Sequence, residues 1–142
     1  MFRKKEKTSE PQSHIDSLIG ADTQIEGNLQ FQGGLRIDGR VTGNVTQLGD
    51  KPSTLVLSEK AFVQGEIHVS HAVINGTVVG PIHSYEYLEL RAQAKVSGAV
   101  SYKNIETQIG ATVDGMVHWL DNAQLDNKVV ALISASEDDY PT

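Results

Sequence analysis

The chain has 142 residues, enough for one domain with a single core, and a formal net charge of −6. It contains no cysteine, which excludes disulfides and cysteine metal sites, and no apolar run approaches the ~20 residues that a membrane-spanning helix needs. Aromatic residues make up only 6% of the chain and glycine occurs 13 times, so the core must be built with few large rings.

Residues 1–17 are expected to form a flexible tail. The start "MFRKKEK" is followed at once by polar residues, which argues against a secretory signal. This start is basic while the remainder of the chain is acidic, so the body of the protein is not expected to bind nucleic acid. An exposed apolar pair beside cations can lie on an anionic bilayer, which predicts a membrane-binding segment. Its residues are Met1, Phe2, Arg3, Lys4 and Lys5.

Residues 18–120 repeat one short phrase, apolar-x-Gly-x-apolar, as in "IEGNL", "VQGEI" and "VDGMV". Its glycines are Gly27, Gly43, Gly65, Gly80, Gly98 and Gly115, spaced by 16, 22, 15, 18 and 17 residues. Apolar residues alternate at period two around them, which indicates strands. Three short strands in each repeat of about 18 residues predict an all-β fold: one parallel β-helix with three sides and about six windings.

The alternation also predicts which side chains face the core and where the repeat is interrupted. The segment "GDKPS" at 49–53 lengthens one repeat and is expected to be a surface loop. The phrase glycines are expected either to face inward, where the section is narrow, or to relax the corners. The side chains expected to face inward are Ile37, Val41, Ile67, Ile74, Val78, Ile82, Val96, Val100, Val113 and Val117.

Three histidines, His68, His83 and His118, follow the same phrase and should share one outward column. Thr46 and Ser101 should occupy other positions of this column. Three histidines on a β-helix suggest the zinc site of gamma-class carbonic anhydrases, but the acid and base groups that such a site needs are missing from the pattern. We therefore interpret the column as a plain surface ladder, and we predict no catalytic residue, no metal and no cofactor.

The ends of a β-helix expose open backbone edges, and open edges recruit further strands. Residues 8–17 are too short and polar to cap the first winding, so polymerisation through the ends is expected. Residues 121–142 should form a second tail, although the fairly apolar stretch 120–136 could cap the last winding. The residues expected at the polymerisation interface are Leu18, Ile19, Ile25, Val117, Trp119 and Leu120.

The segment "HIDSLIGADTQIEGNLQFQGGLRIDGRVTGNV" and the phrases after it closely resemble the bactofilins, bacterial polymer-forming cytoskeletal proteins. The resemblance covers roughly residues 15–118. It implies a right-handed triangular β-helix that joins end to end into filaments without nucleotide. It also implies a cytoplasmic scaffold, attached peripherally to the inner membrane through the Phe-plus-basic start. Such a scaffold would contribute to cell shape or place cell-wall enzymes, with peptidoglycan hydrolases or synthases as partners.

One alternative belongs to another functional class. Left-handed β-helices with hexapeptide repeats include many acyltransferases, so a trimeric β-helix enzyme, either of this type or of the carbonic anhydrase type, competes with the scaffold. Six-residue phasing holds only in patches here: the step from Gly65 to Gly76, for example, is eleven residues. Discrete trimers would favour the enzyme, and nucleotide-free filaments would favour the scaffold.

Overall fold

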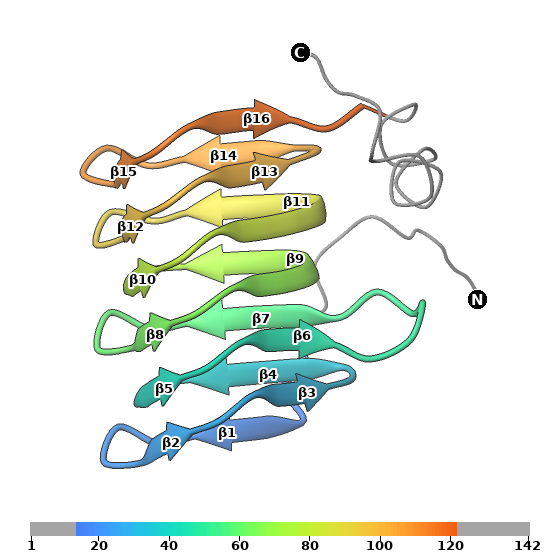
Figure 1. The fold of residues 1–142 in the computed structure, drawn as a ribbon, viewed down its shortest axis with the longest axis vertical. Coiled ribbons are helices and arrows are strands. Elements are labelled where there is room, and N and C mark those ends of the chain that lie inside the picture. Colours follow the sequence, from blue (N-terminus) through green and yellow to red (C-terminus); the bar gives the residue numbers. More distant parts are fainter. Residues whose placement is uncertain (1–13, 122–142) are drawn as a thin grey trace, which may run out of the picture.

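In a computed structural model of the protein, residues 14–121 are the ones whose structure is described. These residues form 16 strands and no helix (Figure 1). Every strand pairing is parallel, and the chain climbs as a solenoid of six windings. Windings one to three contain β1 Ser17–Ile19, β2 Gln24–Glu26, β3 Leu29–Phe31, β4 Gly34–Ile37, β5 Arg40–Thr42, β6 Val45–Gln47, β7 Thr54–Leu57, β8 Phe62–Gln64 and the first part of β9 Ile67–Ile74. Windings four to six contain the rest of β9, then β10 Thr77–Val79, β11 Ile82–Leu90, β12 Lys95–Ser97, β13 Val100–Tyr102, β14 Ile105–Thr107, β15 Thr112–Asp114 and β16 Val117–Trp119.

The solenoid has three faces, as the repeat predicted. Face A is the six-stranded sheet β2-β5-β8-β10-β12-β15. Face B contains β3, β6, the first part of β9, the first part of β11, β13 and β16. Face C contains β1, β4, β7, the second parts of β9 and β11, and β14. Faces B and C form one ten-stranded sheet because β9 and β11 continue from one face to the other.

The expected inward side chains fill the space between the faces. On face A, the column Ile25–Val41–Val63–Val78–Val96–Val113 is in continuous register. Of the ten residues predicted to face inward, the eight from Ile37 to Val100 are at most 2% exposed. Val113 is partly buried against this core. Val117 continues the inward column above Val100, but it is 52% exposed because β16 is the last strand of the described solenoid.

The phrase glycines lie at the corner between faces A and B, so the corner alternative of the sequence analysis is the correct one. Each has a positive φ, from 134° at Gly27 to 159° at Gly115. A Cβ built on any of them except Gly27 would collide with the backbone of the phrase glycine one winding earlier. The corner therefore needs glycine both for its backbone conformation and for close stacking.

The segment 49–53 lies in the connection between β6 and β7, outside any strand, as expected of a surface insertion. Ser53, at its end, is buried and accepts a hydrogen bond from the Gly33 amide (3.3 Å), which fixes the loop against the winding below. The sequence did not predict that β9 and β11 would turn a corner without ending. In β11 the turn coincides with a register shift between Ser84 and Tyr87. The buried Ser84 hydroxyl donates to the carbonyl of Tyr87 there (2.5 Å).

Candidate assembly surfaces and the histidine column

Both ends of the described solenoid have open strand edges. At the first winding, β1, β2 and β3 pair only with β4, β5 and β6. At the last winding, β14, β15 and β16 pair only with β11, β12 and β13. Each end of the described part thus presents three parallel strand edges (Figure 1). The backbone N–H and C=O groups of a strand point towards its neighbours in the sheet, which here means along the solenoid axis.

At the first winding, the structure separates the three residues that we expected at the interface. Ile19 and Ile25 are partly buried and contact the core from the end face, as does Leu29. Leu18 is in register with Arg36 and is 61% exposed. Its side chain therefore lies on the outer flank of face C, at the edge of the end face but not within it.

At the last winding, the predicted interface residues are more exposed. Val117 and Trp119 are both more than half exposed, and Leu120 is half-buried. The Trp119 indole Nε1 donates to the carbonyl of Lys103 (3.0 Å), which holds the ring on the winding. The sequence analysis missed two exposed apolar residues here, Ile109 and Met116. They lie outside the strands, so period-two alternation gave no signal for them.

The two end windings carry the same sign of charge. In the first winding, Asp16, Asp22 and Glu26 are acidic, and no Lys or Arg occurs between residues 14 and 35. Between residues 103 and 121, which form the last winding, Glu106, Asp114 and Asp121 are acidic and Lys103 is the only Lys or Arg. An interface between any two ends therefore brings acidic windings together.

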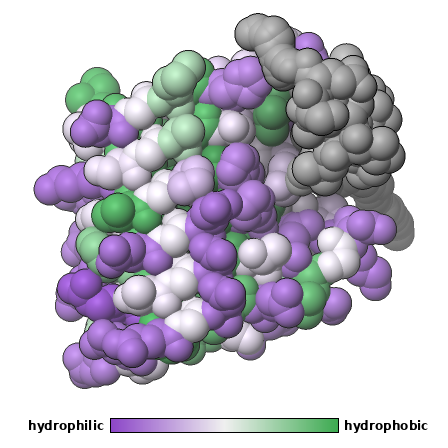
Figure 2. Space-filling view, viewed as in Figure 1, coloured by the Kyte–Doolittle hydropathy of each residue, from purple (hydrophilic) through white to green (hydrophobic). Residues whose placement is uncertain are grey.

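The predicted membrane-binding residues, Met1 to Lys5, lie outside the described residues. Within residues 14–121 the structure contains no helix long and apolar enough to cross a membrane. On the face shown in Figure 2, hydrophilic and intermediate side chains cover most of the described surface, with hydrophobic ones scattered among them.

The histidine column of face B is present as predicted. Thr46, His68, His83, Ser101 and His118 follow one another in register, one per winding. The rings of His68 and His83 are stacked, with centroids 4.3 Å apart and planes at 12°. Neither partner of His68 was predicted: its Nε2 is 2.9 Å from Glu66 Oε1, and its Nδ1 is 2.9 Å from the Tyr85 hydroxyl. The hydrogen bond with His68 lowers the pKa of the Glu66 carboxyl below its ordinary value.

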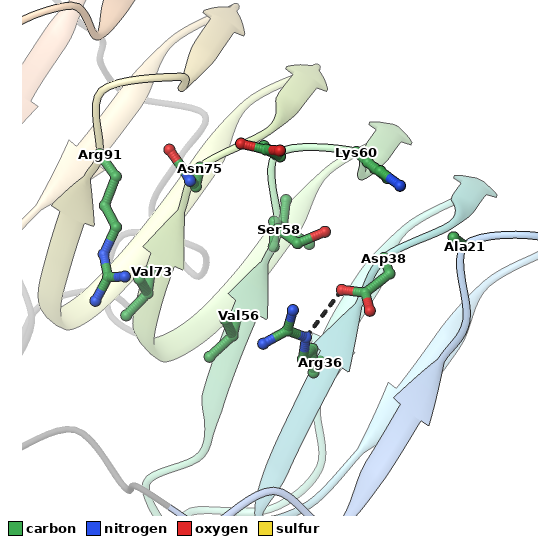
Figure 3. A pocket seen from close by; sticks show the side chains of 11 residues that line it. Ala21, Arg36, Asp38, Val56, Ser58, Lys60, Val73, Asn75 and Arg91 are labelled. Carbon is green, nitrogen blue, oxygen red and sulfur yellow. Dashed lines mark hydrogen bonds and ion pairs between the residues drawn. The ribbon is translucent and has the colours of Figure 1, made fainter.

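A groove of about 420 Å³ lies where face C turns towards face A (Figure 3). Val56 and Val73 contribute its apolar wall, and Arg36 and Arg91 extend into it. Arg36 forms an ion pair with Asp38 (2.9 Å), and Arg91 forms one with Glu89 (3.0 Å). Both guanidinium groups thus already have acidic partners.

Comparison with known proteins gives one family and one relative. Residues 17–118, more than two thirds of the chain, match the family model described as "Bactofilin: Polymer-forming cytoskeletal". The chain is 28% identical over 106 residues to bactofilin BacP of Myxococcus xanthus (strain DK1622). That alignment covers 74% of this chain and 42% of BacP, so the chain spans less than half of that relative's length. No solved structure matches the chain.

Proposed function

Because this chain belongs to the bactofilin family of polymer-forming cytoskeletal proteins, we propose that it is a scaffold subunit that stacks end to end into nucleotide-independent filaments. The observation that carries the proposal is the set of three open strand edges at each end of the described solenoid. Open edges recruit further strands, and a solenoid without polar caps has this tendency at both ends.

Stacking would continue the contacts that already join the windings. The backbone groups of β1, β2 and β3 would gain partners, and the partly exposed Ile19 and Ile25 would become buried. Burying apolar surface contributes about 25 cal/mol per Å². Since the contacts are main-chain hydrogen bonds and apolar packing, the interaction needs no nucleotide. If like ends meet, the contact is two-fold; if unlike ends meet, the filament is polar.

The test introduces one charge at an end face and the same charge on a flank. Ile25→Lys places an ammonium group in the inward column at the open end, where stacking would bury it. Val79→Lys is the matched control, because Val79 is an outward residue of β10 in the middle of the stack. We expect Ile25→Lys to abolish filaments, both in sedimentation and in negative-stain images, and Val79→Lys to retain them. Circular dichroism should show that both variants are folded.

Two further variants refine the interface. Trp119→Arg tests the other end, and its failure to disturb filaments would restrict the contact to the first winding. Leu18→Arg should weaken assembly less than Ile25→Lys, since Leu18 points to the flank. Normal filaments from Ile25→Lys and Trp119→Arg alike, or discrete trimers of the wild type, would contradict the end-to-end scaffold.

We further propose that the start "MFRKK" attaches the filament to the inner face of the cell membrane. Each cation near an anionic surface contributes about 1 kcal/mol, so a single tail binds weakly. A filament presents many tails, and such multivalency raises avidity by about 10²–10⁴.

Changing Phe2 to Ala together with Lys4 and Lys5 to Glu should release filaments from anionic liposomes in co-sedimentation and leave polymerisation intact. Ile25→Lys, which keeps the tail, should bind poorly. If the tail variant binds as well as wild type, the attachment lies elsewhere.

The cellular role that fits this arrangement is a membrane-bound scaffold for cell shape. Recruited partners would be peptidoglycan hydrolases or synthases held along the filament flanks. A fluorescent fusion should form membrane-associated structures that disperse with Ile25→Lys and persist with Val79→Lys. If cell shape and cell-wall enzyme positions are unchanged in the Ile25→Lys strain, the scaffold serves another process.

A further inference from the structure

Face B carries a group of side chains for which filament assembly has no use. His68 of β9 and His83 of β11 lie on adjacent windings with their rings stacked at 4.3 Å. Glu66 precedes His68 by two residues, and its Oε1 is 2.9 Å from His68 Nε2. One ligand atom from each of the three side chains lies within 4.8 Å of the others.

We propose that Glu66, His68 and His83 bind one divalent transition-metal ion of the zinc class on the flank of the solenoid. Imidazole nitrogens and a carboxylate oxygen are ligands that zinc, cobalt and nickel accept. Three protein ligands leave one coordination position for water, as in open zinc sites.

The distances between the ligand atoms fit such an ion after small side-chain movements. A tetrahedral zinc ion with bonds of about 2.1 Å keeps its ligand atoms roughly 3.4 Å apart. The His68–Glu66 pair is closer than this, at 2.9 Å, so the ion would take the place of the hydrogen that joins them. The stacked rings must rotate about their side-chain bonds to direct one nitrogen each at the ion. The His68 side chain is 31% exposed, that of Glu66 is 51% exposed and His83 is half-buried, so all three have room to move.

Tyr85 supplies the outer contact that a metal-binding histidine needs. Its hydroxyl is 2.9 Å from His68 Nδ1, the ring nitrogen away from Glu66. A metal-ligating histidine usually donates its second N–H to such an oxygen, which orients the ring and fixes the tautomer. In the tautomer that carries its proton on Nδ1, His68 donates to the Tyr85 hydroxyl, and Nε2 is left for the ion. Tyr85 is thus a positioning residue.

The backbone below the site is rigid and independent of the ends. Glu66 and His68 belong to the third winding and His83 to the fourth, and both windings have neighbours above and below. The β9–β11 pairing holds the two histidines in direct register. Because the site is on the flank, its loss should leave end-to-end stacking unchanged, so this proposal and the filament proposal can fail separately.

The test titrates the full chain, without a histidine tag, with Zn²⁺ by calorimetry and with Co²⁺ by absorption spectroscopy. We expect one saturable site per chain and a cobalt spectrum of four-coordinate type. His83→Ala and Glu66→Gln should each weaken binding by more than about 10-fold, and Tyr85→Phe by about 10-fold, the lower end of what loss of an outer contact costs. Zinc should raise the thermal unfolding midpoint of wild type but not of His83→Ala.

His118→Ala is the matched control. His118 lies in the same outward column, two windings from His83 with Ser101 between them, so it cannot share the ion. It should bind Zn²⁺ as wild type does. Wild-type affinity in the double variant of His68→Ala and His83→Ala would place the ion elsewhere and overturn the proposal. Equal losses in His118→Ala and His83→Ala, or absence of saturable binding to wild type, would overturn it too.

Discussion

At the residue scale, the corner glycines allow one winding to stack closely on the winding below, because they have no Cβ. Gly65 has φ +153°, and a Cβ there would collide with the Gly43 carbonyl of the winding below. Gly27 has a similar φ of +134°, but a Cβ there would meet nothing within 4 Å, because no described winding lies below it. Substitution of Gly27 should therefore cause backbone strain alone, whereas substitution of Gly65 should cause both strain and a steric collision.

We predict that Gly65→Ala lowers the free energy of unfolding by more than Gly27→Ala does. Strain at a glycine-only conformation costs on the order of 1–3 kcal/mol, which both variants incur. Only Gly65→Ala adds a backbone collision. Chemical denaturation below the concentration at which filaments form is the measurement. Equal losses in the two variants would mean that strain alone, not stacking, requires glycine at this corner.

His71 is a second residue whose surroundings have a measurable consequence. It is 1% exposed, and burial lowers its pKa, against the opposing effect of the Glu86 carboxylate 3.5 Å from its Nε2. A lowered folded-state pKa means that the unfolded chain takes up the proton first as pH falls. The stability that His71 contributes is therefore complete above its ordinary pKa of about 6.5 and is lost as pH falls towards the folded value.

We predict that the thermal unfolding midpoint falls between pH 7 and pH 5, and that His71→Gln makes this fall shallower. Glutamine is neutral throughout the range and similar in size. His118→Gln is the control, since His118 is exposed on the last winding. A pH profile of His71→Gln that parallels wild type would assign the acid sensitivity to other groups.

At the element scale, the short strands act through their alternation. In β10, Val78 is fully buried in the inward column of face A, whereas its neighbour Val79 is 38% exposed. A carboxylate in place of Val78 would be buried without a partner in the middle of the stack. A carboxylate in place of Val79 would stay in contact with water.

We predict that Val78→Asp unfolds the domain or destabilises it by several kcal/mol, while Val79→Asp changes stability by less than about 0.5 kcal/mol. Circular dichroism and thermal unfolding of the two variants provide the comparison. Unchanged unfolding of Val78→Asp would show that the inward column is assigned to the wrong face.

At the scale of the whole molecule, the acidic end windings set how assembly responds to salt. Two such ends repel each other when they stack, and the repulsion is screened as the Debye length contracts from about 8 Å at 0.15 M to about 3 Å at 1 M. We predict that salt lowers the critical concentration for filaments and that Asp22→Asn with Glu26→Gln reduces this dependence. Sedimentation across a salt series measures both. Filaments that dissolve in high salt would contradict the assignment of the acidic windings to the interface. Membrane binding through the basic tail should instead weaken as salt rises, because the attraction between the tail and anionic lipids is screened.

The sequence by itself determined the architecture, because a solenoid is a local rule repeated along the chain. Alternation at period two placed Val41, Val78 and Val96 in the core, and the glycine spacing gave the windings. The His68–His83 register followed from the same phrase alignment. The right-handed sense of winding stays a prediction from the family resemblance, since the same periodicity suits either hand.

Only the tertiary structure decided which residues of the end windings lie on the end faces and which lie on the flank. Leu18 and Ile19 are neighbours in sequence, yet one lies on the flank and the other on the end face. Val117 follows the inward pattern but is exposed, because burial requires a next winding and not only the right periodicity. Tyr85 reaches His68 because β11 continues beyond Ser84 towards face C, a turn that alternation does not encode. The repeats differ in length by up to seven residues. The contacts between windings therefore depend on which corners contain the extra residues, and the packing of the whole stack determines which corners these are.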